Sequence, residues 1–253
     1  MRPRSGCYVR ATVAYDGTGF CGFQVQAGQR TVQGALEEAL AILTQEQIRT
    51  IAAGRTDSGA HALGQVVAFY TRWRHALSDL HRGWNALLPD DVVVLSVAGA
   101  ERGFHPRFSA RSRLYRYTIW NHPVQNPLLR HIAHWVAQPL DMDAMAQAAC
   151  LLVGEHDFAT FGQPPQGDST VRQVLQATWG SSMALFGGDV LHLDIEANAF
   201  LYRMVRSIVG TLLQVGTGEL SVEQFAARFA AADRSQAGPT APANGLCLMA
   251  IRY

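Results

Sequence analysis

The chain has 253 residues, of which 48% are hydrophobic, and its formal net charge is +1. This length suits one large domain or two halves that share a core, and the apolar content is enough to fill that core. No run of about 18 uncharged apolar residues occurs, so we expect no membrane-spanning helix. The opening residues lack the apolar stretch of a signal peptide, which favours a cytoplasmic protein.

The four cysteines are scattered along the chain and form no CxxC pair. This pattern predicts neither a metal site nor a disulfide framework, and it is typical of reduced thiols in a cytoplasmic protein. They are Cys7, Cys21, Cys150 and Cys247.

The basic residues are unevenly distributed. Residues 1–116 hold 14 Arg against 9 acidic residues, whereas residues 117–253 hold 7 against 11. All 21 basic residues are Arg. Arginine has a planar fork of donors that suits phosphate and can stack on bases, which fits nucleic-acid binding. A compositional bias of the source genome explains the missing Lys at least as well.

Strands and helices alternate through the first part of the chain. We expect residues 8–15 to form a strand. We expect Thr31 to be the N-cap of the helix that follows it, in which apolar residues recur at helical spacing. We then expect a strand over 66–70, a helix over 75–88 and a buried strand over 92–97.

Residues 54–69, GRTDSGAHALGQVVAF, combine a turn with a strand and carry the first candidate site. Asp57 lies two residues after Arg55 on a glycine-flanked loop, an arrangement that can hold a site carboxylate next to a cation. The same spacing suits a surface turn in which the carboxylate bonds the local backbone and the arginine is solvated. The spacing alone leaves both interpretations open.

Residues 101–120 are the most basic window of the chain. Arginines alternate with aromatic residues here, which suits looped RNA because phosphates bind Arg and splayed bases stack on rings. In a strand, Tyr115 and Tyr117 would share one face. An edge strand guarded by charges is the alternative interpretation. The arginines of the window are Arg102, Arg107, Arg111, Arg113 and Arg116.

A Pro-containing connection over residues 121–127 is the best internal boundary. It divides the chain into an N-terminal half, 1–120, with the Asp57 loop and the basic window, and a C-terminal half, 121–253. The second half begins with a helix that Gly154 ends.

A long loop over residues 154–170 should follow that helix, and strands over 171–179 and 190–197 predict a hairpin. In the second of these strands, apolar residues alternate with polar ones, which predicts one buried and one solvated face. The residues expected on the solvated face are His192, Asp194 and Glu196.

Residues 200–215 form the strongest predicted helix, with a wide apolar stripe. Arg203 and Arg206 lie inside it near its start. A buried charge that loses its partner costs about 3–5 kcal/mol, so a carboxylate or phosphate should meet one of these arginines. A helix over 221–232 and a closing strand over 246–253 complete the chain.

Seven motifs occur in order over essentially the whole length. They are YDGTGFCGFQVQ with RTVQGALEEAL, GRTDSGAHALGQVVAF, NALLPDDVVV, FHPRFSARSRLYRY, GEHDFATF, ANAFLYRMVRSIVG and APANGLCLMAI. Any one of them is a weak signal, but the series with compatible spacing is specific. Together they resemble the TruA-type tRNA pseudouridine synthases. Ser58 and Ala60 stand where this family more often has Ala and Val, and neither departure removes a functional group.

The resemblance implies an α+β fold of two related halves, each an antiparallel sheet backed by helices, joined in one extended central sheet with the active cleft between them. It implies conversion of uridine to pseudouridine at positions 38, 39 and 40 of the tRNA anticodon arm, where the base must leave a paired stem. No atoms enter or leave, so neither cofactor nor metal is expected. Family members act as homodimers, which nothing else in this sequence indicates.

The resemblance also assigns roles to residues. Asp57 matches the catalytic carboxylate, which can add to a carbon or remove a sugar proton. Arg206 matches its ion-pair partner, a cation that favours the charged form of a carboxylate. Tyr115 would stack on the uracil and accept the C5 proton. Arg55 would hold, or fill the space of, the flipped nucleotide, and Leu246 would give the base pocket an apolar wall.

Recognition in such an enzyme would depend on tRNA shape and phosphates rather than on a base-reading motif. We expect Arg113, Arg116 and Arg203 to contribute to this binding. Two other classes remain as alternatives. A nucleoside or glycoside hydrolase would use the same Asp but normally needs a second carboxylate. A non-catalytic RNA-binding module would not need Asp57 paired with a buried arginine.

Overall fold

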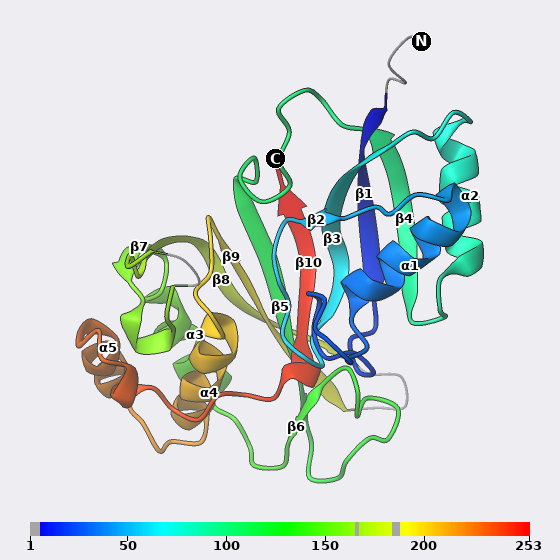
Figure 1. Cartoon of the computed structure of the whole chain (residues 1–253). Helices are drawn as coiled ribbons and strands as arrows, with labels where there is room; N and C mark the ends of the chain where they lie inside the picture. Colours follow the sequence, from blue (N-terminus) through cyan, green and yellow to red (C-terminus); the bar gives the residue numbers. More distant parts are fainter. Residues whose placement is uncertain (1–5, 165–166, 184–187) are drawn as a thin grey trace. The chain divides into compact units, whose positions relative to one another are not determined.

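The computed structural model describes residues 6–164, 167–183 and 188–253. The opening residues 1–5, and residues 165–166 of the expected 154–170 loop, lie outside this description. The chain forms two units: Met1–Arg111 with Leu248–Tyr253, and Ser112–Cys247. Figure 1 shows the helices and strands, coloured along the sequence. The sequence predicted one division after residue 120. The structure places the division after Arg111 and returns the last six residues to the first unit.

The sheet of the first unit has the strand order β4-β1-β3-β10, and the short strand β2 pairs with β3. Strand β1 pairs antiparallel with both β3 and β4, and Tyr8 lies opposite Tyr70 while Tyr15 lies opposite Ala62. The strands are β1 (Cys7–Tyr15), β2 (Ile51–Ala52), β3 (His61–Thr71), β4 (Val92–Gly99) and β10 (Leu246–Arg252), of which the part from Leu248 onward belongs to this unit.

Two helices, α1 (Val32–Thr44) and α2 (Leu77–Leu87), cover one face of this sheet (Figure 1). The predicted cap at Thr31 is confirmed, because its side chain accepts a hydrogen bond from the Gly34 N–H at 3.2 Å. Apolar side chains of β1 and β3 are buried on the helix side. The rings of Phe69 and Trp84 pack edge to face there, with centroids 5.4 Å apart.

The sheet of the second unit has the order β5-β9-β8-β7, with β6 parallel to β5. The predicted hairpin is confirmed as the antiparallel pair of β8 and β9. The expected 154–170 loop is corrected at its start, because residues 154–157 pair with β8 as strand β7. The strands are β5 (Ser112–Asn121), β6 (His134–Val136), β7 (Gly154–Asp157), β8 (Val171–Met183) and β9 (Asp189–Ala197).

The predicted solvated face of β9 is only partly solvated. Glu196 is buried, with 8% of its surface exposed, because its carboxylate accepts a hydrogen bond from the Ser112 hydroxyl at 2.5 Å. Asp194 on the same face accepts two bonds from Arg116, both at 2.7 Å. A buried carboxylate needs such partners, and here the neighbouring strand β5 supplies them.

The helices of the second unit are α3 (Met142–Cys150), α4 (Met204–Gly216) and α5 (Val222–Ala230). Helix α4 is shorter than predicted. The chain before it is held elsewhere, because the Tyr202 N–H donates to the Gln163 carbonyl at 2.9 Å. Arg203, expected inside the helix, is its N-cap residue with a left-handed φ of 58°. Each unit therefore combines a largely antiparallel sheet with helices, and the predicted α+β class is confirmed.

Among the helices of the described residues, none is both long enough and apolar enough to cross a bilayer.

Candidate functional site

Asp57 lies in a tight turn between β2 and β3. The Ala60 N–H donates to the Asp57 carbonyl at 3.1 Å, and Gly59 adopts a φ of 79°, which residues with a side chain rarely adopt. Asp57 is half-buried, whereas Arg55 is exposed. The turn predicted from the two glycines is thus present, with Gly59 at its left-handed position.

A loop over residues 16–31, hereafter the supporting loop, is hydrogen-bonded to this turn. The Thr56 carbonyl accepts a bond from the Phe23 N–H at 3.2 Å, and the Thr56 hydroxyl lies 2.7 Å from the buried hydroxyl of Tyr15. The Ser58 hydroxyl donates to the Phe20 carbonyl at 3.1 Å. The residues on both sides of Asp57 are therefore bonded to another segment, rather than to the turn alone. This arrangement restricts where the carboxylate can lie.

The supporting loop approaches the turn so closely that it needs glycine. A Cβ on Gly17 would lie 1.9 Å from the Ala60 carbonyl oxygen, and one on Gly22 would lie 3.0 Å from the Thr56 carbonyl oxygen. The Gly17 N–H donates to Nδ1 of the buried His61 at 3.1 Å, which ties the loop to the first residue of β3. The YDGTGF motif predicted a turn at residues 16–19 that ends the first strand, and it did not indicate this contact with His61. The contact spans some forty residues, and no local pattern reveals it.

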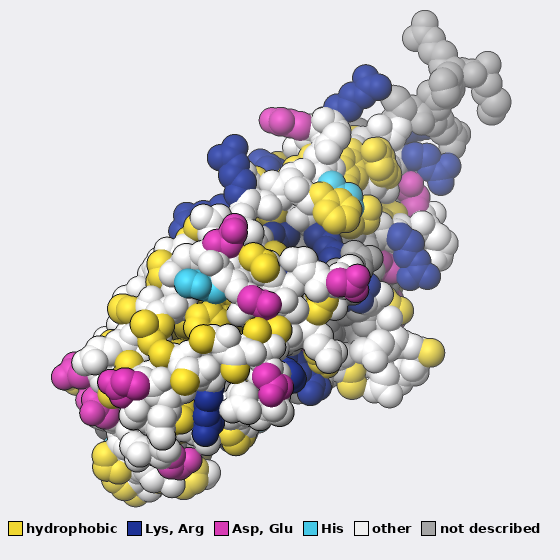
Figure 2. Space-filling view, turned by 90° about the vertical axis from the view of Figure 1, so that its left-hand side faces the viewer, with side chains coloured by type: hydrophobic (Ala, Val, Ile, Leu, Met, Phe, Trp, Pro, Cys, Tyr) yellow, Lys and Arg dark blue, Asp and Glu magenta, His cyan; other side chains and the backbone are white. Residues whose placement is uncertain are grey.

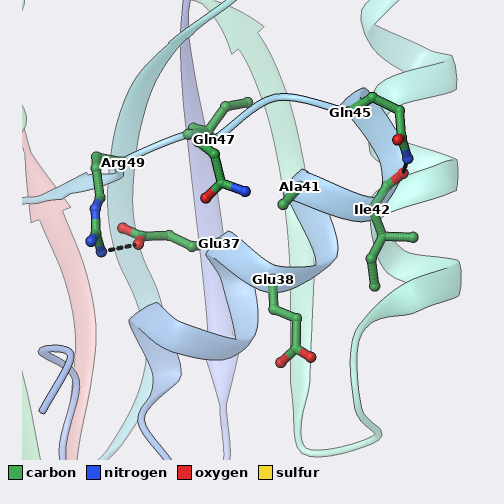
Figure 3. A pocket seen from close by; sticks show the side chains of 8 residues that line it. Glu37, Glu38, Ala41, Ile42, Gln45, Gln47 and Arg49 are labelled. Atoms are coloured by element: carbon green, nitrogen blue, oxygen red, sulfur yellow. Dashed lines mark hydrogen bonds and ion pairs between the residues drawn. The ribbon is translucent and has the colours of Figure 1, made fainter. Parts of the chain in front are cut away.

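A surface hollow of about 660 Å³ lies beside α1 in the same unit, and Figure 3 shows its side chains. None of the predicted site residues lines it. Glu37 accepts bonds there from Arg49 at 2.9 Å and from the Thr50 N–H at 2.8 Å. Glu37 thereby fixes the segment that leads into β2 and the Asp57 turn. With Glu38 it also makes the hollow acidic, which disfavours phosphate binding.

In the second unit, Arg206 is clamped by the segment 238–242. Its Nε donates to the Ala241 carbonyl at 2.7 Å, and the Ala241 N–H donates back to the Arg206 carbonyl at 3.1 Å. The Gly238 N–H adds a bond to the Thr211 hydroxyl at 2.9 Å. The half-buried guanidinium is therefore oriented by a chain segment 35 residues away.

Tyr117 links this segment to β5. Its hydroxyl donates to the Pro242 carbonyl at 2.8 Å, and burial raises the pKa of the phenol, while the nearby Arg206 charge acts in the opposite direction. Tyr115 lies two residues earlier on the same face and packs edge to face on Phe200, with centroids 5.0 Å apart. Leu246, which follows the clamping segment, is buried. The structure thus places Arg206 near Tyr117, and Tyr115 on the same face of β5.

We predict that Gly210→Ala destabilises the second unit. A Cβ at this helix position would lie 1.6 Å from the Pro239 carbonyl oxygen, so the clamping segment must shift. Overpacking of this kind lowers the free energy of unfolding by about 1–3 kcal/mol, which urea titration measures. Gly99→Ala is the control, because no atom lies within 4 Å of its Cβ. Equal free energies of unfolding for the two variants would show that the segment 238–242 can shift at little energetic cost.

The other predicted site arginines have partners within the second unit or lie at its surface. Arg113 donates to the Asn198 carbonyl at 2.7 Å, and Arg116 forms the paired bonds with Asp194. The hydrogen bonds to Asp194 raise the pKa of Arg116. Arg203 is exposed, and its guanidinium lies 4.9 Å from the Tyr202 ring centroid.

The charge asymmetry of the sequence persists in the two units. The first holds 13 Arg against 9 acidic residues, a balance of +4, and the second holds 8 against 11, a balance of −3. Figure 2 shows side chains of both signs, arginine in dark blue and acidic residues in magenta, on the surface that faces the viewer. In the part of the chain that the structure describes, no three His, Cys, Asp or Glu side chains group as metal ligands would.

Asp57 and Arg55 belong to the first unit, and Tyr115, Arg206 and Leu246 to the second. The predicted ion pair of Asp57 with Arg206 would join the two units and stays a prediction.

Comparison with known proteins identifies relatives over nearly the whole chain. The family model described as tRNA pseudouridine synthase matches residues 11–109 and 148–253. Proteins named tRNA pseudouridine synthase A are similar: that of Chloroflexus aurantiacus is 50% identical over 95% of this chain and 87% of its own length. That of Roseiflexus castenholzii is 46% identical over 95% and 88%, and that of Moorella thermoacetica 43% over 97% and 99%.

Proposed function

The chain belongs to the tRNA pseudouridine synthase family, and we propose that it isomerises uridine at positions 38, 39 and 40 of the tRNA anticodon arm with Asp57 as the catalytic carboxylate. As a member of this family it is an isomerase that makes pseudouridine in tRNA. The reaction breaks the N1–C1′ bond, turns the uracil and joins C5 to C1′. Uridine and pseudouridine contain the same atoms, so the reaction needs no second substrate.

The observation that carries the proposal is the support of the Asp57 turn. A carboxylate that attacks a carbon or removes a proton must be held within a fraction of an ångström of its target. The bonds to Thr56 and Ser58 from strand β1 and the supporting loop hold the backbone on both sides of Asp57. A surface turn with a solvated carboxylate would have no need of this second segment.

Arg206 and Tyr115 are the proposed partners of Asp57. The clamp by Ala241 orients the Arg206 guanidinium, which in the proposed site pairs with the carboxylate and keeps it charged. Tyr115 offers a ring that can stack on uracil and a hydroxyl that can accept the C5 proton. A phenol is a poor base at neutral pH without a cation nearby, and Arg206 would be that cation.

Base flipping completes the proposed mechanism. The target uridine lies in a paired stem, so it must be extruded at a cost of a few kcal/mol. Arg55, which is exposed two residues before Asp57, would fill the vacated space or hold the nucleotide. Leu246 would line the base pocket, and Arg203 would meet a phosphate. Arg113 and Arg116, bonded within their unit, would contribute charge without leaving their partners.

Release of tritium from tRNA labelled at uracil C5 tests the proposal against its alternatives. Label release without free uracil is expected, because C5 loses its hydrogen when it bonds to C1′. Free uracil would indicate a hydrolase, and tRNA binding without release would indicate an RNA-binding module. Transcripts with uridine at only one of positions 38, 39 and 40 then identify the positions modified.

Tyr15→Phe tests whether the support beneath the turn serves catalysis. The variant keeps the ring but removes the hydroxyl that bonds Thr56. We expect the turnover number to fall about tenfold to a hundredfold through misplacement of Asp57, with the KM for tRNA nearly unchanged. Stability should fall by about 1 kcal/mol. Tyr70→Phe, which alters an exposed tyrosine, is the control. A wild-type turnover number for Tyr15→Phe would show that the remaining bonds suffice.

The proposal includes a cytoplasmic homodimer, because TruA-type tRNA pseudouridine synthases act as dimers on tRNA. Light scattering of the purified protein at catalytic concentration measures the assembled mass. A monomer with full activity would remove the dimer from the proposal and leave the chemistry intact.

A further inference from the structure

Residues 100–111, which follow β4, form a fixed loop in the first unit, hereafter the 100–111 loop. Its ends are bonded to neighbouring strands: the Ala100 N–H donates to the Tyr8 carbonyl and the Arg111 N–H to the Arg252 carbonyl, both at 2.8 Å. Inside the loop, Nδ1 of His105 accepts the backbone N–H groups of residues 107 and 108, each at 3.2 Å. The loop therefore has a defined shape, and it pays little ordering cost on binding a partner.

The loop presents an aromatic side chain to solvent. Phe108 is 74% exposed, and the His105 ring packs against it with centroids 4.3 Å apart. The Arg107 guanidinium lies 5.6 Å from the Phe108 ring centroid. Phe104, in contrast, is packed inward against Tyr253 at 5.0 Å. An exposed ring beside a cation, on a fixed loop, is the arrangement on which an unpaired nucleic-acid base stacks.

The charge around this ring is positive. Arg102 and Arg111 are exposed on the loop, and the Arg10 guanidinium lies 5.7 Å from the Phe104 ring centroid. With Arg107 these make four arginines, against the single acidic residue of the loop, Glu101. Such a surface complements the phosphates of a nucleic acid.

The remainder of the basic window serves the protein itself. Arg113 and Arg116 lie in β5, where the first bonds the Asn198 carbonyl and the second is paired with Asp194. The sequence offered an RNA-binding window and an edge strand guarded by charges as alternatives for residues 101–120, and the strand, β5, pairs with both β6 and β9. The structure separates them: the strand part holds internal bonds, and the loop part faces solvent.

The Ala100 end of the 100–111 loop and the Asp57 turn lie at opposite ends of β1 in the first unit. Tyr8, whose carbonyl bonds the loop, and Tyr15, whose hydroxyl bonds Thr56 beside Asp57, are seven residues apart in β1. At about 3.3 Å per residue this separation is roughly 23 Å. Figure 1 shows the C-terminus, whose Arg252 bonds the loop, near the end of β10. This end of the loop is therefore well separated from the Asp57 turn.

We propose that the 100–111 loop binds the substrate tRNA away from the reacting uridine, with Arg102 and Arg111 on phosphates and Phe108 stacked on an unpaired base. This inference rests on the proposed function for the identity of the RNA. The loop supplies affinity and does not take part in the chemistry. Changes in it raise the KM for tRNA and leave the turnover number at saturating tRNA unchanged.

The first test compares two double variants of equal charge. Arg102→Gln with Arg111→Gln removes the loop charges, and Arg74→Gln with Arg82→Gln removes two exposed arginines elsewhere in the unit. tRNA binding is measured between about 50 and 200 mM salt. Each lost phosphate contact lowers the magnitude of the slope of log K against log salt by about 0.7–0.9, so the loop variant, which lacks two arginines, should lose about 1.4–1.8. The control should keep the wild-type slope.

The second test addresses Phe108. Phe108→Ala should weaken tRNA binding about 5- to 100-fold through the loss of one stacked base, whereas Phe108→Trp should bind as the wild type does. Thermal melting checks that both variants fold, which their exposed position favours.

Two outcomes would overturn the inference. The loop variants could bind tRNA like the control at every salt concentration, or they could lose turnover with unchanged affinity. The proposed function fails separately, if the wild-type protein releases no tritium from labelled tRNA. The binding measurements do not depend on that release, so the two failures can be told apart.

Discussion

Asp57→Ala is expected to bind tRNA with wild-type affinity and to release no tritium above background. The substitution removes the carboxylate but leaves the bonds that hold the turn, because those bonds involve the Thr56 and Ser58 side chains and the backbone. Loss of a group that forms or breaks bonds in the reaction lowers turnover on the order of 10⁴-fold or more. Filter binding and the tritium assay on one transcript measure the two quantities.

Two further variants make this result specific. Asp57→Asn keeps the size of the side chain and removes its charge, so it should be as inactive as the alanine variant. Ser58→Ala removes only the bond to the Phe20 carbonyl, and the resembling family often has Ala there, so it should retain most activity. Residual turnover in both Asp57 variants would mean that another group carries the chemistry.

Local signals in the sequence predicted the elements of the fold well. Thr31 is confirmed as an N-cap. The helix expected over 221–232 is present as α5, and the structure adds a capping box between Ser221 and Gln224. Apolar spacing located α1, and alternation located β9. These features depend on neighbours within a few residues, which a single sequence displays.

The errors arose where distant segments decide the local structure. Residues 154–157 form β7 only because β8 lies alongside, and the start of α4 is set by the bond between Tyr202 and Gln163. Glu196 is buried because Ser112, 84 residues away, satisfies its carboxylate. No periodicity records such partners, since they are selected by tertiary packing.

The candidate site shows the same division. The resemblance named Asp57, Tyr115 and Arg206, because the residues of a motif can be matched without a structure. It gave no role to Tyr15 or to the segment that clamps Arg206, which act through Thr56 and Ala241. Supporting residues of this kind carry no chemistry of their own, so only their contacts reveal them.

Tyr115→Phe is expected to bind tRNA normally and to slow product formation by about 10²- to 10⁴-fold, the range of general base catalysis. The phenylalanine ring can keep the edge-to-face contact with Phe200, whose centroid lies 5.0 Å away, and the stacking on uracil. Only the hydroxyl is lost, so a defect in turnover without a defect in affinity assigns it to proton transfer. Single-turnover assays with excess enzyme separate the two.

A deuterium label at uracil C5 sharpens this test. If the Tyr115 hydroxyl accepts the C5 proton, its removal should make that step limiting, and the rate ratio of unlabelled to deuterated tRNA should rise above the wild-type value. Tyr202→Phe, which alters an exposed tyrosine of the same unit, should leave both rate and ratio unchanged. A wild-type rate in Tyr115→Phe would remove this residue as the proton acceptor, and a slow rate with an unchanged ratio would limit it to positioning the base.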